Sequence, residues 1–221
     1  MSKQQLFLDV ECYPNYFLAL FRTADGKSKA FEAYDGQPLD TAGLERYLTH
    51  PSFEIVTFNG NGYDIPILTY ALDTPDPASL FRRTEDIIVG NLTPWAFYKQ
   101  FGIQPPAVDH IDLIEVAPGD GSLKQYAGRI HSKKIQDLPY EPNHILTESQ
   151  MSEVALYCDN DLDVLEDLWN ALQPQIEQRV ALSERYGIDV RSKINEQLAE
   201  AILKLQCEKV CQCQTTGQAC E

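Results

Sequence analysis

The sequence lacks a hydrophobic run long enough to cross a membrane as a helix. The longest apolar stretch near its start, residues 16–21, covers only part of the roughly 20 residues that such a helix needs. A secretory signal peptide is also excluded, because Asp9 and Glu11 interrupt the only apolar segment at the N-terminus. We therefore expect a cytoplasmic protein.

Basic residues are scarce as well. The 221 residues include 18 Lys and Arg against 33 Asp and Glu, which gives a net charge of −15. Nucleic-acid binders gain much of their affinity by placing basic side chains on phosphates, so this chain should bind a polyanion weakly unless metal ions neutralise its acidic groups. Six local basic residues fit either a strand-guiding surface or ordinary solvated charges: Arg82, Arg83, Lys124, Arg129, Lys133 and Lys134.

The cysteines lack the paired C-x-x-C spacing of zinc knuckles. Cys12 and Cys158 lie inside expected strands or helices and are typical of small buried side chains in a reducing compartment. The other four lie in the last fifteen residues, in a polar segment: Cys207, Cys211, Cys213 and Cys220. For residues 207–221 we expect a disordered tail, with a zinc site as the alternative.

What the sequence does contain is an alternation of strand and helix patterns. Short apolar runs predict strands over residues 4–10, 16–22, 28–34, 54–58 and 110–116. Helical spacing predicts helices over residues 39–50, 65–72, 122–130, 147–186 (divided near Pro174) and 188–205. We expect an α/β fold with a mixed central sheet flanked by helices and with C-terminal helices. The predicted organisation is one domain over residues 1–187, a helical extension over 188–206 and the tail.

Three short acidic clusters follow these elements in order. Asp9 and Glu11 end the first strand two residues apart, so both carboxylates project from one face. Alone, this pattern is equally typical of two polar residues at a strand end. The apolar neighbours favour a metal site, because a carboxylate among them is costly to desolvate unless a cation compensates its charge.

The second cluster is the loop of residues 59–64, after the fourth strand. Its Asn and Gly residues favour a tight turn whatever the function. Asp64 precedes an apolar helix, where it could cap the helix or support a metal ion. Asn59 could donate a hydrogen bond to a ligand or hold the turn.

In the third cluster, Tyr157 and Asp161 are four residues apart in a predicted helix and share one face. A phenol there can hold a water molecule while the carboxylate holds a metal; the alternative is a packed tyrosine above a solvated aspartate. An EF-hand is excluded, because Val164 stands where its loop requires glycine and the helical pattern continues.

The joint pattern resembles that of the DEDDy-type 3′–5′ exonucleases, in the DnaQ-like (RNase H-like) superfamily. D-x-E, N-x-x-x-Y-D and Y-x-x-x-D occur in this order over residues 6–186. The amino-acid sequence is most similar to that of the proofreading exonuclease domains of bacteriophage DNA polymerases. Those domains also carry segments like HIDLIEV (residues 110–116) and SLKQYAGR (residues 122–129). The resemblance implies an RNase H-like fold, and a location in the host cytoplasm if a phage encodes the chain.

The resemblance also implies roles for single residues. The first of two Mg²⁺ or Mn²⁺ ions would be held by Asp9, Glu11 and Asp161. Asp9 would bridge to the second ion, Asp64 would support that ion through water, and Tyr157 would orient the attacking water. Contacts to the DNA 3′ end are expected from Tyr13, Phe58, Asn59, Tyr63 and Lys124. The aromatic side chains among them are equally typical of a protein core.

We therefore expect a metal-dependent 3′–5′ exodeoxyribonuclease that acts on single-stranded or frayed DNA 3′ ends. It would be a stand-alone nuclease or the proofreading part of a split or truncated DNA polymerase. The acidic charge favours delivery to DNA by a partner such as a DNA polymerase or another replication protein. Two alternatives stay open: an exoribonuclease, and a catalytically idle module of this fold that docks to a polymerase.

Overall fold

The computed structural model describes residues 3–132 and 135–216, with side chains as far as residue 208. A five-stranded sheet forms its centre: β1 (Gln4–Tyr13), β2 (Tyr16–Thr23), β3 (Ser28–Ala33), β4 (Phe53–Thr57) and β5 (His110–Asp112). The strand order is β3-β2-β1-β4-β5, in which β1, β2 and β3 are antiparallel neighbours and β4 and β5 continue parallel to β1. This mixed sheet has the RNase H-like arrangement, so the predicted fold class is confirmed.

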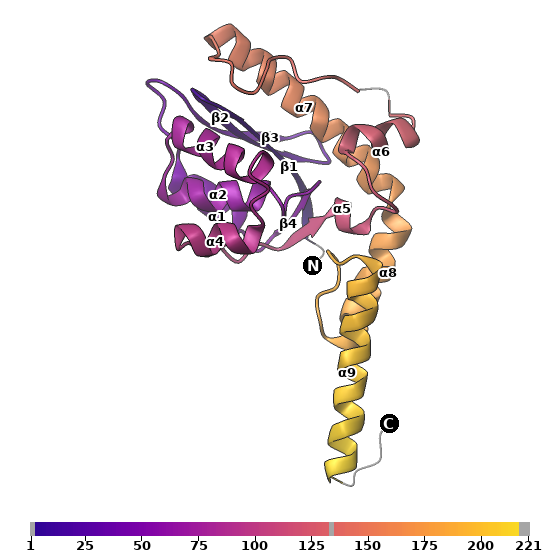
Figure 1. The fold of residues 1–221 in the computed structure, drawn as a ribbon. Coiled ribbons are helices and arrows are strands. Elements are labelled where there is room, and N and C mark those ends of the chain that lie inside the picture. Colours follow the sequence, from indigo (N-terminus) through magenta and orange to yellow (C-terminus); the bar gives the residue numbers. More distant parts are fainter. Residues whose placement is uncertain (1–2, 133–134, 217–221) are drawn as a thin grey trace.

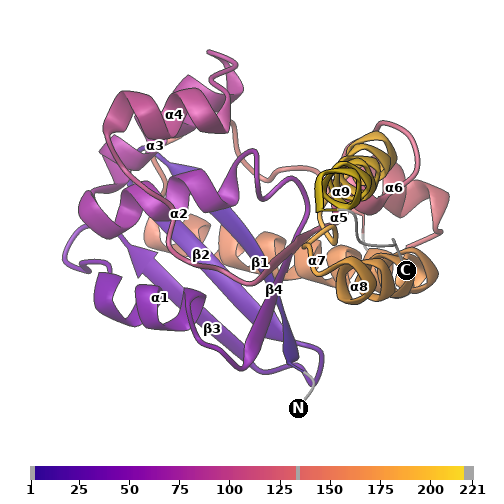
Figure 2. The same ribbon diagram turned by 90° about the horizontal axis from the view of Figure 1, so that it is seen from below.

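The described helices are α1 (Thr41–Leu48), α2 (Asp64–Asp73), α3 (Pro77–Ile88), α4 (Pro94–Phe101), α5 (Leu113–Val116), α6 (Leu123–Arg129), α7 (Glu148–Ala171), α8 (Gln173–Tyr186) and α9 (Asn195–Thr216). Helices α1 to α3 cover one face of the sheet, α4 packs against α2, and α7 crosses the other face (Figure 1, Figure 2). Helix α9 projects away from this body (Figure 1). No helix in the described part of the chain is long and apolar enough to span a membrane.

The alternation of side chains along β1 builds two cores and positions the first acidic pair. Leu6 and Leu8 pack on the α1–α3 side, whereas Phe7 and Tyr13 pack on the α7 side. Since successive residues of a strand point to opposite faces, Asp9 and Glu11 share the face of Phe7 and Tyr13, under α7.

The C-terminal half differs from the sequence prediction in two places. The predicted strand over residues 110–116 is wrong beyond Asp112, because the Asp112 side chain accepts a hydrogen bond from the Ile114 amide and starts α5. The helix predicted from residue 188 begins only at Asn195, and the buried side chain of Val190 packs the preceding segment into the body.

Two other features of this half bear on the predicted boundaries. The break between α7 and α8 confirms the predicted division, with Pro174 in the first turn of α8. Helix α9 continues to Thr216 and so passes through most of the segment expected to be a disordered tail. Residues 217–221, and with them Cys220, lie outside the described residues. The division into a domain, an extension and a tail stays a prediction.

Candidate active site

Three of the predicted carboxylates converge between β1 and α7. One oxygen atom each of Asp9, Glu11 and Asp161 can be chosen so that all three lie within 4.8 Å of one another. Asp9 and Glu11 come from the sheet, and Asp161 comes from the helix that crosses the sheet face. Residues 150 positions apart in the sequence therefore form one site.

Burial and mutual repulsion make this cluster costly in its charged form. Burial, and then the nearby charge of Asp161, raise the pKa of Asp9 to about 7. Burial, and then the charges of Asp9 and Asp161, hold the pKa of Glu11 well above its usual range. The positive charge of Lys124 on α6 lowers the pKa of both Glu11 and Asp161, but burial still leaves the pKa of Asp161 raised. A divalent cation would relieve this repulsion.

Asp64, in the first turn of α2, stands outside this group of three but near enough for its charge to act on Asp9 and Glu11, and it does not cap that helix. Its side chain is buried, the N-cap position is Tyr63, and the Oδ1 atom has no hydrogen-bond partner among the described residues. Burial, and then the charges of Asp9 and Asp112, raise its pKa well above the usual range. The unpaired buried oxygen and a donor set made only of carboxylates fit Mg²⁺ or Mn²⁺, which prefer hard oxygen ligands.

Tyr157 lies one turn before Asp161 on α7, and its hydroxyl donates a hydrogen bond that lowers the pKa of Asp161. Burial, and then the charge of Asp161, raise the pKa of the Tyr157 phenol, so it stays protonated at neutral pH. The Nζ atom of Lys124 lies 5.6 Å from the centroid of the Tyr157 ring. The phenol is therefore held at the carboxylates as a donor.

Two residues that the sequence did not single out for this site contact its members. The Cys158 thiol donates to Asp9 Oδ2 across 3.3 Å, although the sequence indicated only a small buried side chain. Asp112 is fully buried and accepts hydrogen bonds from the backbone amides of Asn59 (2.7 Å) and Asn61 (2.8 Å). A carboxylate inside the apolar run HIDLIEV was the available signal, since it must find partners when buried.

Two aromatic side chains expected to contact DNA are held within the fold. Tyr13 is 1% exposed and donates from its hydroxyl to the Tyr140 carbonyl across 3.3 Å. The Phe58 ring packs edge-on against Tyr126, with 5.7 Å between the ring centroids. A role of these rings in stacking on bases stays a prediction that the placement of Tyr13 does not support.

The other three candidates for DNA contacts differ in their surroundings. The Tyr63 and Thr84 hydroxyls are 3.1 Å apart. Asn59 has a φ of 64°, a left-handed conformation that asparagine tolerates better than most residues. Its backbone amide donates a hydrogen bond to the Asp112 carboxylate. Of the five candidates, Lys124 is the one whose charge acts on the carboxylates.

Comparisons with known proteins give a likeness of fold alone. No protein-family model and no curated protein matches the chain. Among solved structures, E. coli exonuclease I in complex with a dT13 oligonucleotide is similar, with 13% sequence identity and a TM-score of 0.36. The likeness covers 82% of this chain and 44% of that one, so the chain spans less than half the length of that exonuclease. At this level of similarity, the fold assignment rests on the strand order and directions of this chain.

Proposed function

We propose that this protein is a DEDDy-type, metal-dependent 3′–5′ exonuclease that hydrolyses DNA from single-stranded or frayed 3′ ends. One observation carries the proposal: Asp161, far along the sequence in α7, meets Asp9 and Glu11 of β1 within 4.8 Å, with Tyr157 on the same helix as Asp161. The direction of cleavage and the choice of DNA come from the resemblance of the three motifs.

The chain's own residues divide the work between binding and orientation. Asp9, Glu11 and Asp161 would hold one divalent ion, and Asp64 would support a second. Two such ions, when bound, lower the pKa of a water molecule and stabilise the leaving 3′ oxygen. Tyr157 keeps its proton and orients the attacking water by a hydrogen bond. Lys124 supplies a positive charge that favours the anionic form of Glu11 and Asp161, against the burial that raises the pKa of both.

The charge of the chain bears on how it reaches DNA. With a net charge of −15, the protein gains little from counterion release, so we propose that a partner such as a DNA polymerase delivers the 3′ end. The resemblance of the motif sequences to bacteriophage polymerases favours a phage-type nuclease or the proofreading part of a split polymerase. An exoribonuclease and an idle docking module are the competing functions.

Labelled oligonucleotides test the proposal. DNA and RNA oligomers of one sequence, labelled at either end, are incubated with Mg²⁺, Mn²⁺ or EDTA. The wild-type protein should convert 5′-labelled DNA into a ladder of shortened products and release the 3′ label first as a mononucleotide. EDTA and Asp9→Ala should abolish both. The matched control is Asp35→Ala, which alters an exposed aspartate in the turn after β3.

Each contrary result points to a different function. Cleavage that survives EDTA or Asp9→Ala would contradict the metal site. Faster cleavage of RNA than of DNA would favour the exoribonuclease. A folded protein without activity on either substrate, with either metal, would favour the docking module.

A further inference from the structure

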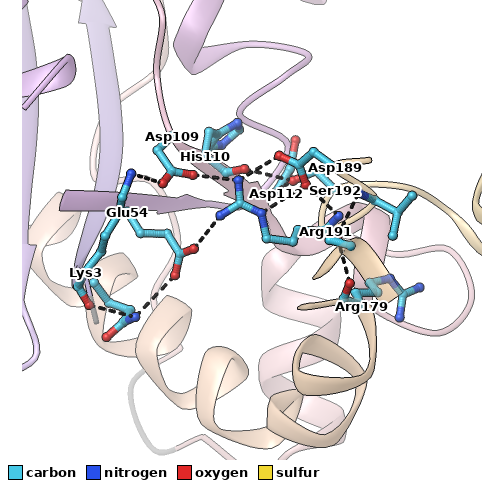
Figure 3. A network of polar contacts seen from close by, with 12 residues as sticks. Lys3, Glu54, Asp109, His110, Asp112, Arg179, Asp189, Arg191 and Ser192 are labelled. Atoms are coloured by element: carbon cyan, nitrogen blue, oxygen red, sulfur yellow. Dashed lines mark hydrogen bonds and ion pairs between the residues drawn. The ribbon is translucent and has the colours of Figure 1, made fainter. Parts of the chain in front are cut away.

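The segment between α8 and α9 returns to the edge of the sheet beside β4 and β5, where Figure 3 shows a network of polar contacts. Val190 is fully buried, and Arg191 Nη1 lies 2.7 Å from Glu54 Oε1. Arg191 Nη2 lies 2.7 Å from Asp109 Oδ1. Two partly buried ion pairs from one guanidinium therefore fix this segment against β4 and against the residue that precedes β5.

The next residue, Ser192, extends the segment's contacts to β5 by two hydrogen bonds. Its Oγ atom accepts from the Asp112 backbone amide across 2.8 Å and donates to the His110 carbonyl across 3.2 Å. These bonds pair two backbone groups of β5 on its outer side, where the sheet has no further strand among the described residues. The segment that follows α8 thereby fixes the backbone of Asp112 in place (Figure 3).

The Asp112 carboxylate in turn holds the loop that leads to Asp64. Its two oxygens accept from different amides, Oδ1 from Asn59 and Oδ2 from Asn61. The loop continues these contacts into α2, because the Ile65 amide donates to the Gly60 carbonyl across 2.9 Å. The first turn of α2, with Asp64 in it, is thus built on a loop that one buried carboxylate organises.

We propose that Asp112 is a positioning residue for Asp64, and that Ser192 holds Asp112 in place for this role. The inference rests on the proposed function, in which Asp64 supports a metal ion. Asp112 acts through the backbone of residues 59–61 and does not itself bind the ion. The segment after α8 then belongs to the catalytic unit, in contrast to the predicted boundary at residue 187.

A purely electrostatic role for Asp112 is the competing explanation, since its charge raises the pKa of Asp64. Substitutions at Asp112 and at Ser192 separate these roles. Asp112→Asn removes the charge and turns one acceptor into a donor that faces an amide. Ser192→Ala keeps the charge and removes only the hydroxyl, while Ser192→Thr restores it. Asp35→Asn is the matched control for a lost exposed carboxylate.

Hydrogen exchange in EDTA tests the positioning without any metal. The amides of Asn59 and Asn61 should exchange at least tenfold faster in Asp112→Asn and several-fold faster in Ser192→Ala. They should keep the wild-type rates in Ser192→Thr and Asp35→Asn. Unchanged rates at these two amides in a folded Asp112→Asn protein would overturn the proposal. If Asp112→Asn does not fold, the comparison of Ser192→Ala with Ser192→Thr gives the same decision.

Mn²⁺ binding, measured by the electron paramagnetic resonance signal of the free ion, links the loop to the site. Asp112→Asn should weaken binding of the ion at Asp64 about tenfold, as partners of ligand residues commonly do. In Asp64→Asn, adding Asp112→Asn should cause no further loss, because both changes act on one ligand. If the two substitutions instead reduce Mn²⁺ affinity by factors that multiply, the inference is overturned while the proposed function stands. A wild-type protein that binds no Mn²⁺ would overturn the proposed function and the inference with it.

Discussion

The guanidinium of Arg22 in β2 lies 2.7 Å from the Asp163 carboxylate in α7, measured from Nη2 to Oδ1. Its Nη1 atom donates to Asp159 Oδ1 across 2.9 Å, and only 8% of the arginine side chain is exposed. Asp159 and Asp163 flank Asp161 in the sequence. The buried Arg22 thus fixes one turn of α7 to the sheet, and this turn carries Asp161, a proposed metal ligand.

Replacing this arginine should destabilise the protein strongly. In Arg22→Gln, the two aspartates lose their cationic partner, and we expect the free energy of unfolding to fall by about 2–4 kcal/mol. Urea unfolding in EDTA measures the change. Arg82→Gln, at an exposed arginine of α3, should cost less than about 0.5 kcal/mol. Equal losses in the two variants would contradict the role of Arg22.

Asp9→Asn should change the response of the protein to metal ions in a specific way. At about 100 times its dissociation constant, Mn²⁺ should stabilise the wild-type protein by about 2.7 kcal/mol, or roughly 5–10 °C in the melting temperature. The variant should lose most of this shift. In EDTA at pH 8 it should melt no lower than wild type, because the substitution removes a buried charge beside Asp161. A variant that keeps the full Mn²⁺ shift would exclude Asp9 as a ligand.

The carboxylates that meet in the site could be predicted because each stands in a regular element with a fixed period. The spacing of Asp9 and Glu11 places them on one strand face, and that of Tyr157 and Asp161 on one helix face. Asp64 was ambiguous from its local sequence, since an aspartate before a helix is commonly a cap. The folded structure excludes the cap, because Tyr63 holds the N-cap position and Asp64 is buried in the first turn of the helix.

The support of the site could not be predicted, because it depends on contacts between distant segments. Ser192 meets Asp112 over 80 positions, and Arg22 meets Asp163 over 141. A serine in a short connection or an arginine in a strand carries no periodic signal. The early end of β5 has a different, local origin, because the Asp112 side chain competes with the strand for the Ile114 amide.

His110 should make the stability of the protein depend on pH. Burial, and then the charge of Arg191, lower the pKa of His110 from 6.5 to about 4. Between these values the unfolded chain binds a proton that the folded protein does not bind. The stability from this group is therefore complete above about pH 6.5 and is lost as the pH falls through about 4, by at most about 3 kcal/mol.

The variant His110→Gln isolates this contribution from the carboxylates that titrate in the same range. Glutamine retains a hydrogen-bonding partner for the Thr57 hydroxyl, which lies 2.7 Å from His110 Nε2. The difference in unfolding free energy between wild type and variant should shrink or reverse as the pH is lowered from 7 to 4.5. Urea unfolding at several pH values measures it, and a constant difference would contradict the lowered pKa.

Tyr157→Phe should slow the reaction without removing the metal site. The substitution keeps the ring beside Lys124 but removes the hydroxyl that would orient the attacking water. We expect kcat to fall about a hundredfold, the size of effect seen when one catalytic hydrogen-bond donor is deleted, with KM changed less than about threefold. Mn²⁺ affinity should stay within a few-fold of wild type, because the three carboxylates remain. Tyr47→Phe, on the opposite side of the sheet, serves as the control. A Tyr157→Phe protein with wild-type kcat would assign the phenol to packing alone.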